Sequence, residues 1–155
     1  LVARMLGAGA PQLAGALRQA LAGARHALPS AVVDGERWFW PDGERPQSAR
    51  HRVDDALRLL APFDPIVWDR PRFERLWGWA YRFEAYTPAA RRRFGHYALP
   101  LLWHDRVIGW ANVAVQAGEP VASLGHAGAS PRGPAFTAAL DDELARLRRF
   151  LTASE

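Results

Sequence analysis

The strongest candidate for a chemical role is a run of three arginines, Arg91, Arg92 and Arg93, followed closely by His96 and Tyr97. A guanidinium group stays charged at any ordinary pH, and its planar set of donors matches the oxygens of a phosphate. Three adjacent guanidinium groups beside aromatic side chains could therefore bind the backbone of a nucleic acid. A solvated loop that binds nothing is the alternative, because most runs of charge are solvated.

Other arginines could extend this surface, since all 20 basic residues are arginine and the formal net charge is +4. A GC-rich genome explains the choice of arginine equally well, but the basic balance favours a nucleic-acid partner. Arg18 and Arg25 are seven positions apart on one face of a predicted helix. A solvated helix face that binds nothing is an equal alternative for these two residues. The further candidates for phosphate contacts are Arg70, Arg72, Arg75, Arg18 and Arg25.

The sequence contains no recognisable catalytic centre. There is no cysteine, and none of the five histidines has a second ligand at the spacing of a metal site, so we expect no metal and no cofactor. Asp64 and Asp69 could be an acid–base pair. Because Asp64 directly precedes a proline and Asp69 stands where a helix begins, turn and N-cap roles are favoured for them.

Residues 1–44 are predicted to form a winged helix–turn–helix that is truncated at its N-terminus. A helical pattern is stopped by a glycine turn, and Pro11 opens a second helix with leucines spaced by threes and fours. Asp34 and Gly35 between β-forming residues predict a hairpin, which would be the wing. The second helix then occupies the recognition position. We expect a linker over residues 45–56.

The rest of the chain, residues 57–155, is predicted to be a β-barrel domain with a C-terminal helix. Val53 to Leu60 is expected to start as a short helix and become extended. A short amphipathic helix ending at Gly78 follows, and then a strand in which Arg82 and Glu84 face away from the apolar side chains.

Three more strands and a helix complete the prediction. We expect these strands to form an antiparallel meander, which protects its edge strands by curling. A helix beginning at Pro134 carries an apolar stripe that would cover the strands. The expected strands span residues 97–103, 106–116 and 121–126. The fold class is thus α+β, with a partial winged helix–turn–helix followed by a small antiparallel β-barrel or curled sheet and a covering C-terminal helix.

Four blocks of this sequence resemble the C-terminal half of the YcaQ/AlkZ-like bacterial DNA glycosylases. They read LLAPFDPIVWDR at residues 59–70, RLWG at 75–78, YRFE at 81–84 and PAARRRFGHYALP at 88–100. The order and spacing of the blocks are similar to the family over roughly residues 29–110. The resemblance implies tandem winged-helix motifs, a C-terminal β-barrel and a basic concave surface for duplex DNA. It also implies excision of alkylated bases and unhooking of interstrand crosslinks, by hydrolysis of the N-glycosidic bond without a metal.

This chain departs from the family in two places. The family's catalytic motif, Gln-x-Gln or Gln-x-Asp, lies in its N-terminal part, and no glutamine here is followed two residues later by Gln or Asp. Family members often have a basic residue and an aspartate where Trp110, Ala111 and Asn112 stand here. The glutamines are Gln12, Gln19, Gln47 and Gln116.

We therefore predict that the chain is the DNA-binding C-terminal portion of such a glycosylase and has no catalytic residue of its own. Its partner would be double-stranded DNA. We expect a cytoplasmic monomer without a membrane segment. Two alternatives stay open: a structural or protein-interaction module, and a winged-helix DNA-binding protein without glycosylase activity.

Overall fold

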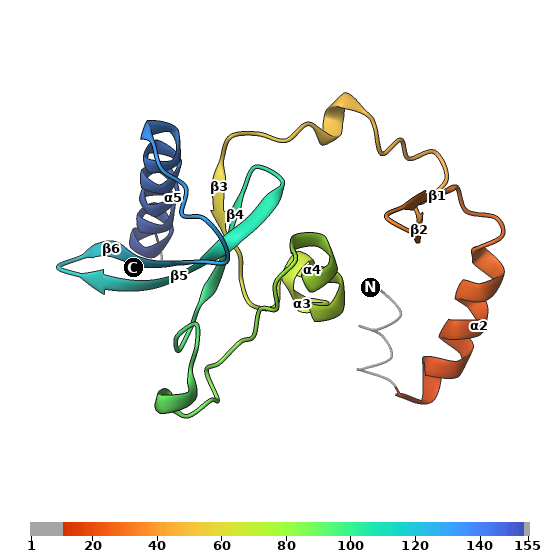
Figure 1. Ribbon diagram of the computed structural model, residues 1–155, viewed down its shortest axis with the longest axis horizontal. Helices are drawn as coiled ribbons and strands as arrows, with labels where there is room; N and C mark the ends of the chain where they lie inside the picture. The colour runs from red at the N-terminus through yellow and green to blue at the C-terminus, as the bar shows by residue number, and fades with distance from the viewer. Residues whose placement is uncertain (1–10, 154–155) are drawn as a thin grey trace. The chain divides into compact units, whose positions relative to one another are not determined.

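The computed structural model describes residues 11–153, and the chain divides into two compact units, Leu1–Arg52 and Val53–Glu155 (Figure 1). The division falls within the stretch predicted as a linker. The finer domain boundaries drawn from the sequence stay a prediction.

Within residues 11–52, the described part of the first unit, there is one α-helix and one β-hairpin. Its elements are the 3-10 helix η1 (Pro11–Leu13), the α-helix α2 (Ala14–Ala24), the strands β1 (Ser30–Val33) and β2 (Glu36–Phe39), and the 3-10 helix η2 (Ala49–His51). The predicted hairpin is confirmed, and Asp34 and Gly35 both have positive φ, 50° and 77°, as a two-residue turn of the primed type requires. The predicted helix before Gly7 lies outside the described residues, so the winged-helix assignment stays a prediction.

The second unit is built on a four-stranded antiparallel sheet with the order β3-β4-β5-β6. The strands are β3 (Leu57–Leu59), β4 (Leu99–Trp103), β5 (Arg106–Gln116) and β6 (Glu119–His126), and α5 (Pro134–Thr152) is the last helix. Helix α5 contacts both β3 and β6, the two edge strands of the sheet (Figure 1). The predicted covering helix is confirmed.

Of the two forms predicted for the sheet, a β-barrel or a curled sheet, the barrel is wrong because the sheet does not close. Closure would require the edge strands β3 and β6 to pair with each other, and they do not. The edge of β3 is instead protected by α5, whose buried Glu143 accepts a hydrogen bond from the backbone N–H of Leu59 at 2.8 Å. A covered edge does not need a barrel to satisfy its hydrogen bonds.

Two short helices, α3 (Pro65–Trp68) and α4 (Arg70–Trp77), occupy the proline- and aspartate-rich stretch. Asp64 caps α3 by accepting from the N–H of Ile66 at 2.8 Å, and Asp69 caps α4 by accepting from the N–H of Arg72 at 3.4 Å. Gly78 ends α4 in the left-handed conformation. The predicted cap roles of the two aspartates are confirmed.

Replacing Asp64 by alanine should lower the free energy of unfolding by about 1 kcal/mol, because the N–H of Ile66 loses its acceptor. Urea unfolding followed by tryptophan fluorescence measures the change. The control is Asp141→Ala, which removes an exposed carboxylate from the middle of α5. Equal stabilities of the two variants would contradict the cap role.

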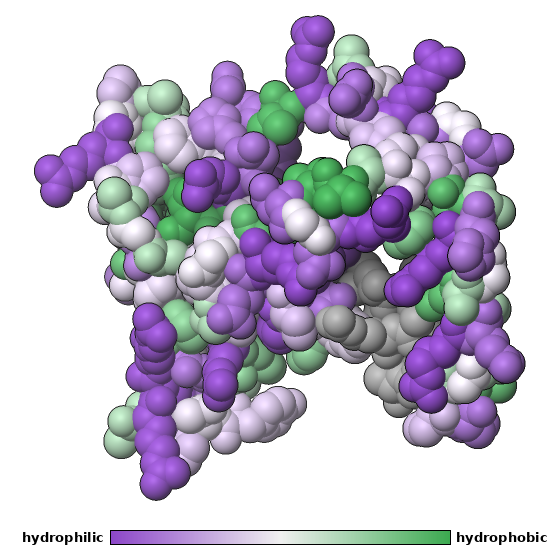
Figure 2. Space-filling model, turned by 45° about the vertical axis from the view of Figure 1, so that its right-hand side comes forward, coloured by the Kyte–Doolittle hydropathy of each residue, from purple (hydrophilic) through white to green (hydrophobic). Residues whose placement is uncertain are grey.

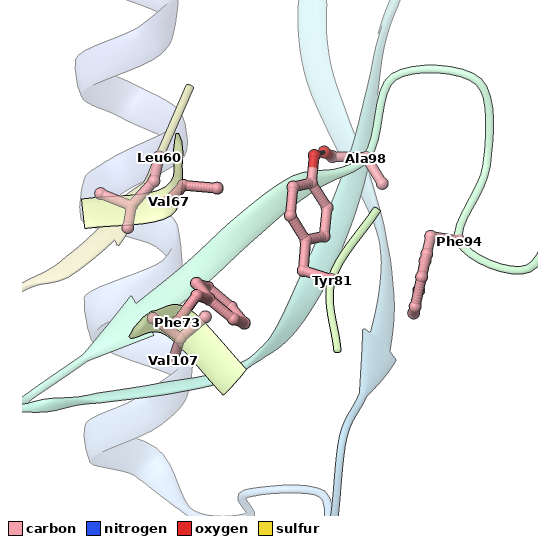
Figure 3. Close-up of a cluster of buried hydrophobic side chains, with 7 residues drawn as sticks. All are labelled: Leu60, Val67, Phe73, Tyr81, Phe94, Ala98 and Val107. Atoms are coloured by element: carbon pink, nitrogen blue, oxygen red, sulfur yellow. Dashed lines mark hydrogen bonds between the residues drawn. The ribbon is translucent and has the colours of Figure 1, made fainter. Parts of the chain in front are cut away.

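An aromatic-rich core holds the helices α3 and α4 to the sheet. Phe73 is fully buried and contacts the rings of Trp77, Trp79 and Tyr81 at centroid distances of 4.7, 5.0 and 5.9 Å. The hydroxyl of Tyr81 donates to the carbonyl of Ala98 at 2.6 Å, as Figure 3 shows. The buried members of this core are Leu60, Val67, Phe73, Tyr81, Phe94, Ala98 and Val107.

Two local predictions in this unit are wrong. Residues 53–60 contain no helix, and their regular secondary structure is strand β3. Residues 80–85 form no strand, and Glu84 is buried at 7% exposure where the alternating pattern predicted solvent. The carboxylate of Glu84 accepts hydrogen bonds from backbone N–H groups later in the chain. These bonds allow Glu84 to be buried, although the alternating pattern predicted that its side chain would be exposed.

Candidate nucleic-acid interface

The three adjacent arginines lie between α4 and β4 in residues 87–97, which we call the arginine loop and which include the short 3-10 helix η3 (Ala89–Arg91) (Figure 1). Glu84 lies just before it and organises its backbone. One carboxylate oxygen of Glu84 accepts from the N–H groups of Arg93, Phe94 and Gly95 at 2.8, 2.7 and 3.4 Å. A buried carboxylate thus fixes three consecutive residues at the end of the arginine run.

The pKa of Glu84 follows from this geometry. Burial alone would raise the pKa of the carboxyl, but the hydrogen bonds from Phe94, Arg93 and Gly95 lower it, and the charge of Arg92 lowers it further. The net result is a pKa below the ordinary value of 4.5. Glu84 is therefore an anion at neutral pH and keeps the loop backbone closed around it.

Two further hydrogen bonds hold the loop and the residue that follows it, one from β5 and one from Tyr81. Asn112 on β5 donates its side-chain N–H to the carbonyl of Phe94 at 2.8 Å. Gly95 has a φ of 123°, and a Cβ atom on it would lie 2.3 Å from the amide oxygen of Asn112, so glycine is required there. Burial raises the pKa of Tyr81 to about 12, so its hydroxyl stays protonated and donates to Ala98 just after the loop.

The fixed loop separates the three arginines by role. Arg92 is partly buried and donates from Nε to the carbonyl of Thr87 at 2.8 Å, which closes the loop on itself. Arg91 and Arg93 are exposed, as are His96 and Tyr97. Hydrophilic side chains dominate the face of the molecule drawn in Figure 2, and hydrophobic ones form small separate areas on it. Charged groups of the loop are thus available to solvent and to a ligand.

Arg70 and Arg72 are engaged within the protein. Arg70 donates to the carbonyls of Val67 and Pro62 at 2.8 and 3.0 Å, and its guanidinium carbon lies 4.5 Å from the centroid of the Tyr81 ring. Burial lowers the pKa of Arg70. Arg72 donates to the carbonyl of Pro65. Several N–H groups of the Arg70 and Arg72 guanidiniums are thus hydrogen-bonded to the backbone of residues 62–67.

The remaining predicted residues are exposed on a helix or directly after one. Arg75 lies on the surface of α4. Arg18 lies on α2 and Arg25 directly follows it, both in the first unit. The guanidinium of Arg25 lies 5.7 Å from the centroid of the Phe39 ring on β2.

Sequence reasoning missed Glu84 and Asn112, the two residues that fix the loop. An acidic residue in an alternating apolar pattern is normally exposed, and Asn112 lies within a long strand. The available signals were that Glu84 belongs to a block that resembles the family and that Asn112 lies where the chain departs from the family.

Neither a metal site nor a membrane span is found in residues 11–153. No three or more His, Cys, Asp or Glu side chains there are grouped so that they could hold a metal ion. No helix in this part of the chain is both long and apolar enough to cross a membrane.

Comparison with known families gives a match over nearly the whole chain. The model of the family described as DNA glycosylase AlkZ-like matches residues 4–150, which extends the resemblance on both sides. No solved structure matches the chain. The protein therefore belongs to the AlkZ-like family of DNA glycosylases.

Proposed function

We propose that this chain is the DNA-binding portion of a DNA glycosylase that removes alkylated bases or unhooks interstrand crosslinks. The catalytic Gln-x-Gln or Gln-x-Asp motif is not contained in the chain. The observation that supports DNA binding best is the arginine loop, whose backbone is fixed by a buried anion while Arg91 and Arg93 stay exposed.

A fixed loop suits a phosphate ligand because less conformational entropy is lost when the complex forms. Arg91, Arg93 and His96 would contact the backbone of double-stranded DNA directly. Arg92 and Arg70 would act mainly by keeping the loop and the neighbouring turn in place, since both donate to backbone carbonyls.

The other residues are proposed as supporting contacts. Arg75 is exposed on α4. Arg18 is exposed on α2, the predicted recognition helix of a winged helix–turn–helix, and Arg25 is exposed directly after it. Phosphate contacts position a protein on DNA without reading its sequence. The loop should therefore bind DNA of any sequence with similar affinity.

The double variant Arg91→Gln/Arg93→Gln should bind duplex DNA roughly ten-fold more weakly at low salt, because it loses two phosphate contacts. The slope of log affinity against log salt concentration should fall in magnitude by about 1.8. Fluorescence anisotropy with a labelled duplex measures both quantities.

The matched control is Arg132→Gln/Arg149→Gln, which removes two exposed arginines outside the loop and leaves the same net charge. It should lose much less affinity. Equal losses in the two double variants would show that net charge, not the loop, drives binding. Absence of duplex binding by the unsubstituted chain at low salt would favour the structural or protein-interaction alternative.

Incubating the chain with a duplex that contains alkylated bases should release no base, because the chain lacks the family's catalytic motif. Chromatography of the reaction products measures release. Base release by the chain would place a catalytic centre within it and contradict this part of the proposal.

A further inference from the structure

We propose that four aromatic side chains in and beside the arginine loop form a stacking site for unpaired nucleic-acid bases. These residues, which we call the aromatic patch, are Phe63, Phe83, Tyr86 and Tyr97. The chain should then prefer DNA that contains an unpaired base within a duplex over fully paired duplex. This inference rests on the proposed DNA binding and names the kind of DNA that the loop region prefers.

Phe83 is the centre of the patch. Its ring centroid lies 5.4 Å from that of Phe63, 6.2 Å from that of Tyr86 and 5.2 Å from that of Tyr97. The interplanar angles are 66°, 84° and 90°, so all three contacts are edge-to-face. The four rings are therefore one continuous cluster, with residues from three separate segments of the unit.

The outer rings of the patch are exposed to an unusual degree for aromatic side chains. Tyr86 is 93% exposed, Phe63 is 62% exposed and Tyr97 is 51% exposed. A contiguous apolar cluster left in water is typical of a binding surface. Because an edge-to-face contact covers a face of only one ring, and Tyr86 is almost fully exposed, the face of the Tyr86 ring is available to a flat partner.

The backbone that carries these rings is held by buried neighbours. Phe83 lies between Tyr81, which is 1% exposed, and the anchored Glu84. Tyr97 directly precedes Ala98, which is 1% exposed and accepts the Tyr81 hydroxyl. The N–H of Thr87 donates to the carbonyl of Glu84 at 3.0 Å, which forms a turn around Tyr86. A partner would meet rings already close to their bound positions.

The arginines that lie close in sequence to the aromatic patch indicate that its partner is a nucleic acid. Tyr97 follows His96 in the arginine loop, and Tyr86 precedes Thr87, whose carbonyl holds Arg92. Aromatic rings adjoining arginines are the combination that binds nucleic acid with exposed bases, because the rings stack on bases and the cations contact the backbone. In a fully paired duplex each base is covered on both faces by its neighbours, so an unpaired base is needed for stacking.

The test compares two labelled duplexes that differ only by one extra, unpaired nucleotide in the middle of one strand. The 155-residue chain should bind the bulged duplex more tightly than the paired one. Tyr86→Ala should reduce affinity for the bulged duplex about five-fold or more, the range measured for loss of one base–aromatic stack, with about a two-fold change or less for the paired duplex. Tyr86→Trp, which keeps a ring, should retain the preference.

The control is Phe150→Ala, which removes another exposed ring, 67% exposed, from α5. It should leave both affinities unchanged. Equal binding of the two duplexes by the unsubstituted chain, or a preference that survives Tyr86→Ala, would overturn the stacking site while leaving the DNA-binding proposal intact. An equal loss on both duplexes in Tyr86→Ala would also overturn it. Failure of the unsubstituted chain to bind either duplex would instead overturn the DNA-binding proposal itself.

Discussion

Replacing Glu84 by alanine should lower the free energy of unfolding of the second unit by about 3–5 kcal/mol. The substitution removes one acceptor and leaves the N–H groups of Arg93, Phe94 and Gly95 without their partner. Each unsatisfied buried donor costs about 1–3 kcal/mol, reduced where water can reach it. Urea unfolding of the chain, followed by tryptophan fluorescence, measures the loss.

The control for this variant is Glu74→Ala, which removes an exposed carboxylate from α4 and should change stability by less than about 0.5 kcal/mol. A loss of the same small size in Glu84→Ala would show that the three hydrogen bonds do not stabilise the unit.

The contribution of Glu84 should depend on pH in a definite direction. Because the pKa of the folded state lies below the ordinary 4.5, the stabilisation is fully present above that pH. It is lost as the pH falls through the lower pKa of the folded state. The stability difference between the unsubstituted chain and Glu84→Gln should therefore shrink in strong acid. A difference that stays constant with pH would show that the charge of Glu84 plays no part.

Glu84→Ala also separates conformation from charge in DNA binding. The variant loses one negative charge and its net charge rises by one, so electrostatics alone predicts tighter binding. If the fixed loop presents Arg91 and Arg93 to phosphates, binding should weaken instead, at a temperature where the variant is folded. Fluorescence anisotropy with a paired duplex distinguishes the two outcomes, and tighter binding would contradict the role of loop conformation.

Replacing Phe73 by alanine should lower the free energy of unfolding by about 3–5 kcal/mol, because it leaves a cavity at the centre of the aromatic core. Phe73 has no exposed surface and contacts Trp77, Trp79 and Tyr81, so these large rings cannot easily move to fill the space. Urea unfolding and the near-ultraviolet circular dichroism of the tryptophans measure the effect.

Phe150→Ala is the matched control, since it deletes the same side chain at a position that is 67% exposed. It should cost much less than Phe73→Ala. Similar losses in the two variants would show that the core around Phe73 does not carry the stability of this unit.

Three of the features that were predicted correctly depend on neighbours close in sequence. Asp34 and Gly35 form a hairpin turn through their own backbone angles. Asp64 caps a helix by accepting from a residue two positions later. Gly78 ends a helix because it adopts a positive φ without strain. Each of these effects acts within one turn of the chain, so a short window of sequence contains all of its causes.

The sequence also determined the family and the position of the arginine run. The order and spacing of the sequence blocks can be recognised without knowledge of the fold, and the family match over residues 4–150 agrees with them. The sequence could not show that Arg91 and Arg93 stay exposed while Arg92 turns back onto the carbonyl of Thr87.

Only the tertiary structure decided which polar residues are buried and whether the sheet closes. Glu84 accepts from a residue nine positions later, and Asn112 holds a carbonyl 18 positions earlier. Glu143 protects the edge of β3 across 84 positions. Burial of a charge depends on the partners that folding brings to it, and periodicity within a segment contains no information about those partners. The sequence alone thus identifies the run of three arginines, and the folded second unit determines which of these three a ligand can reach.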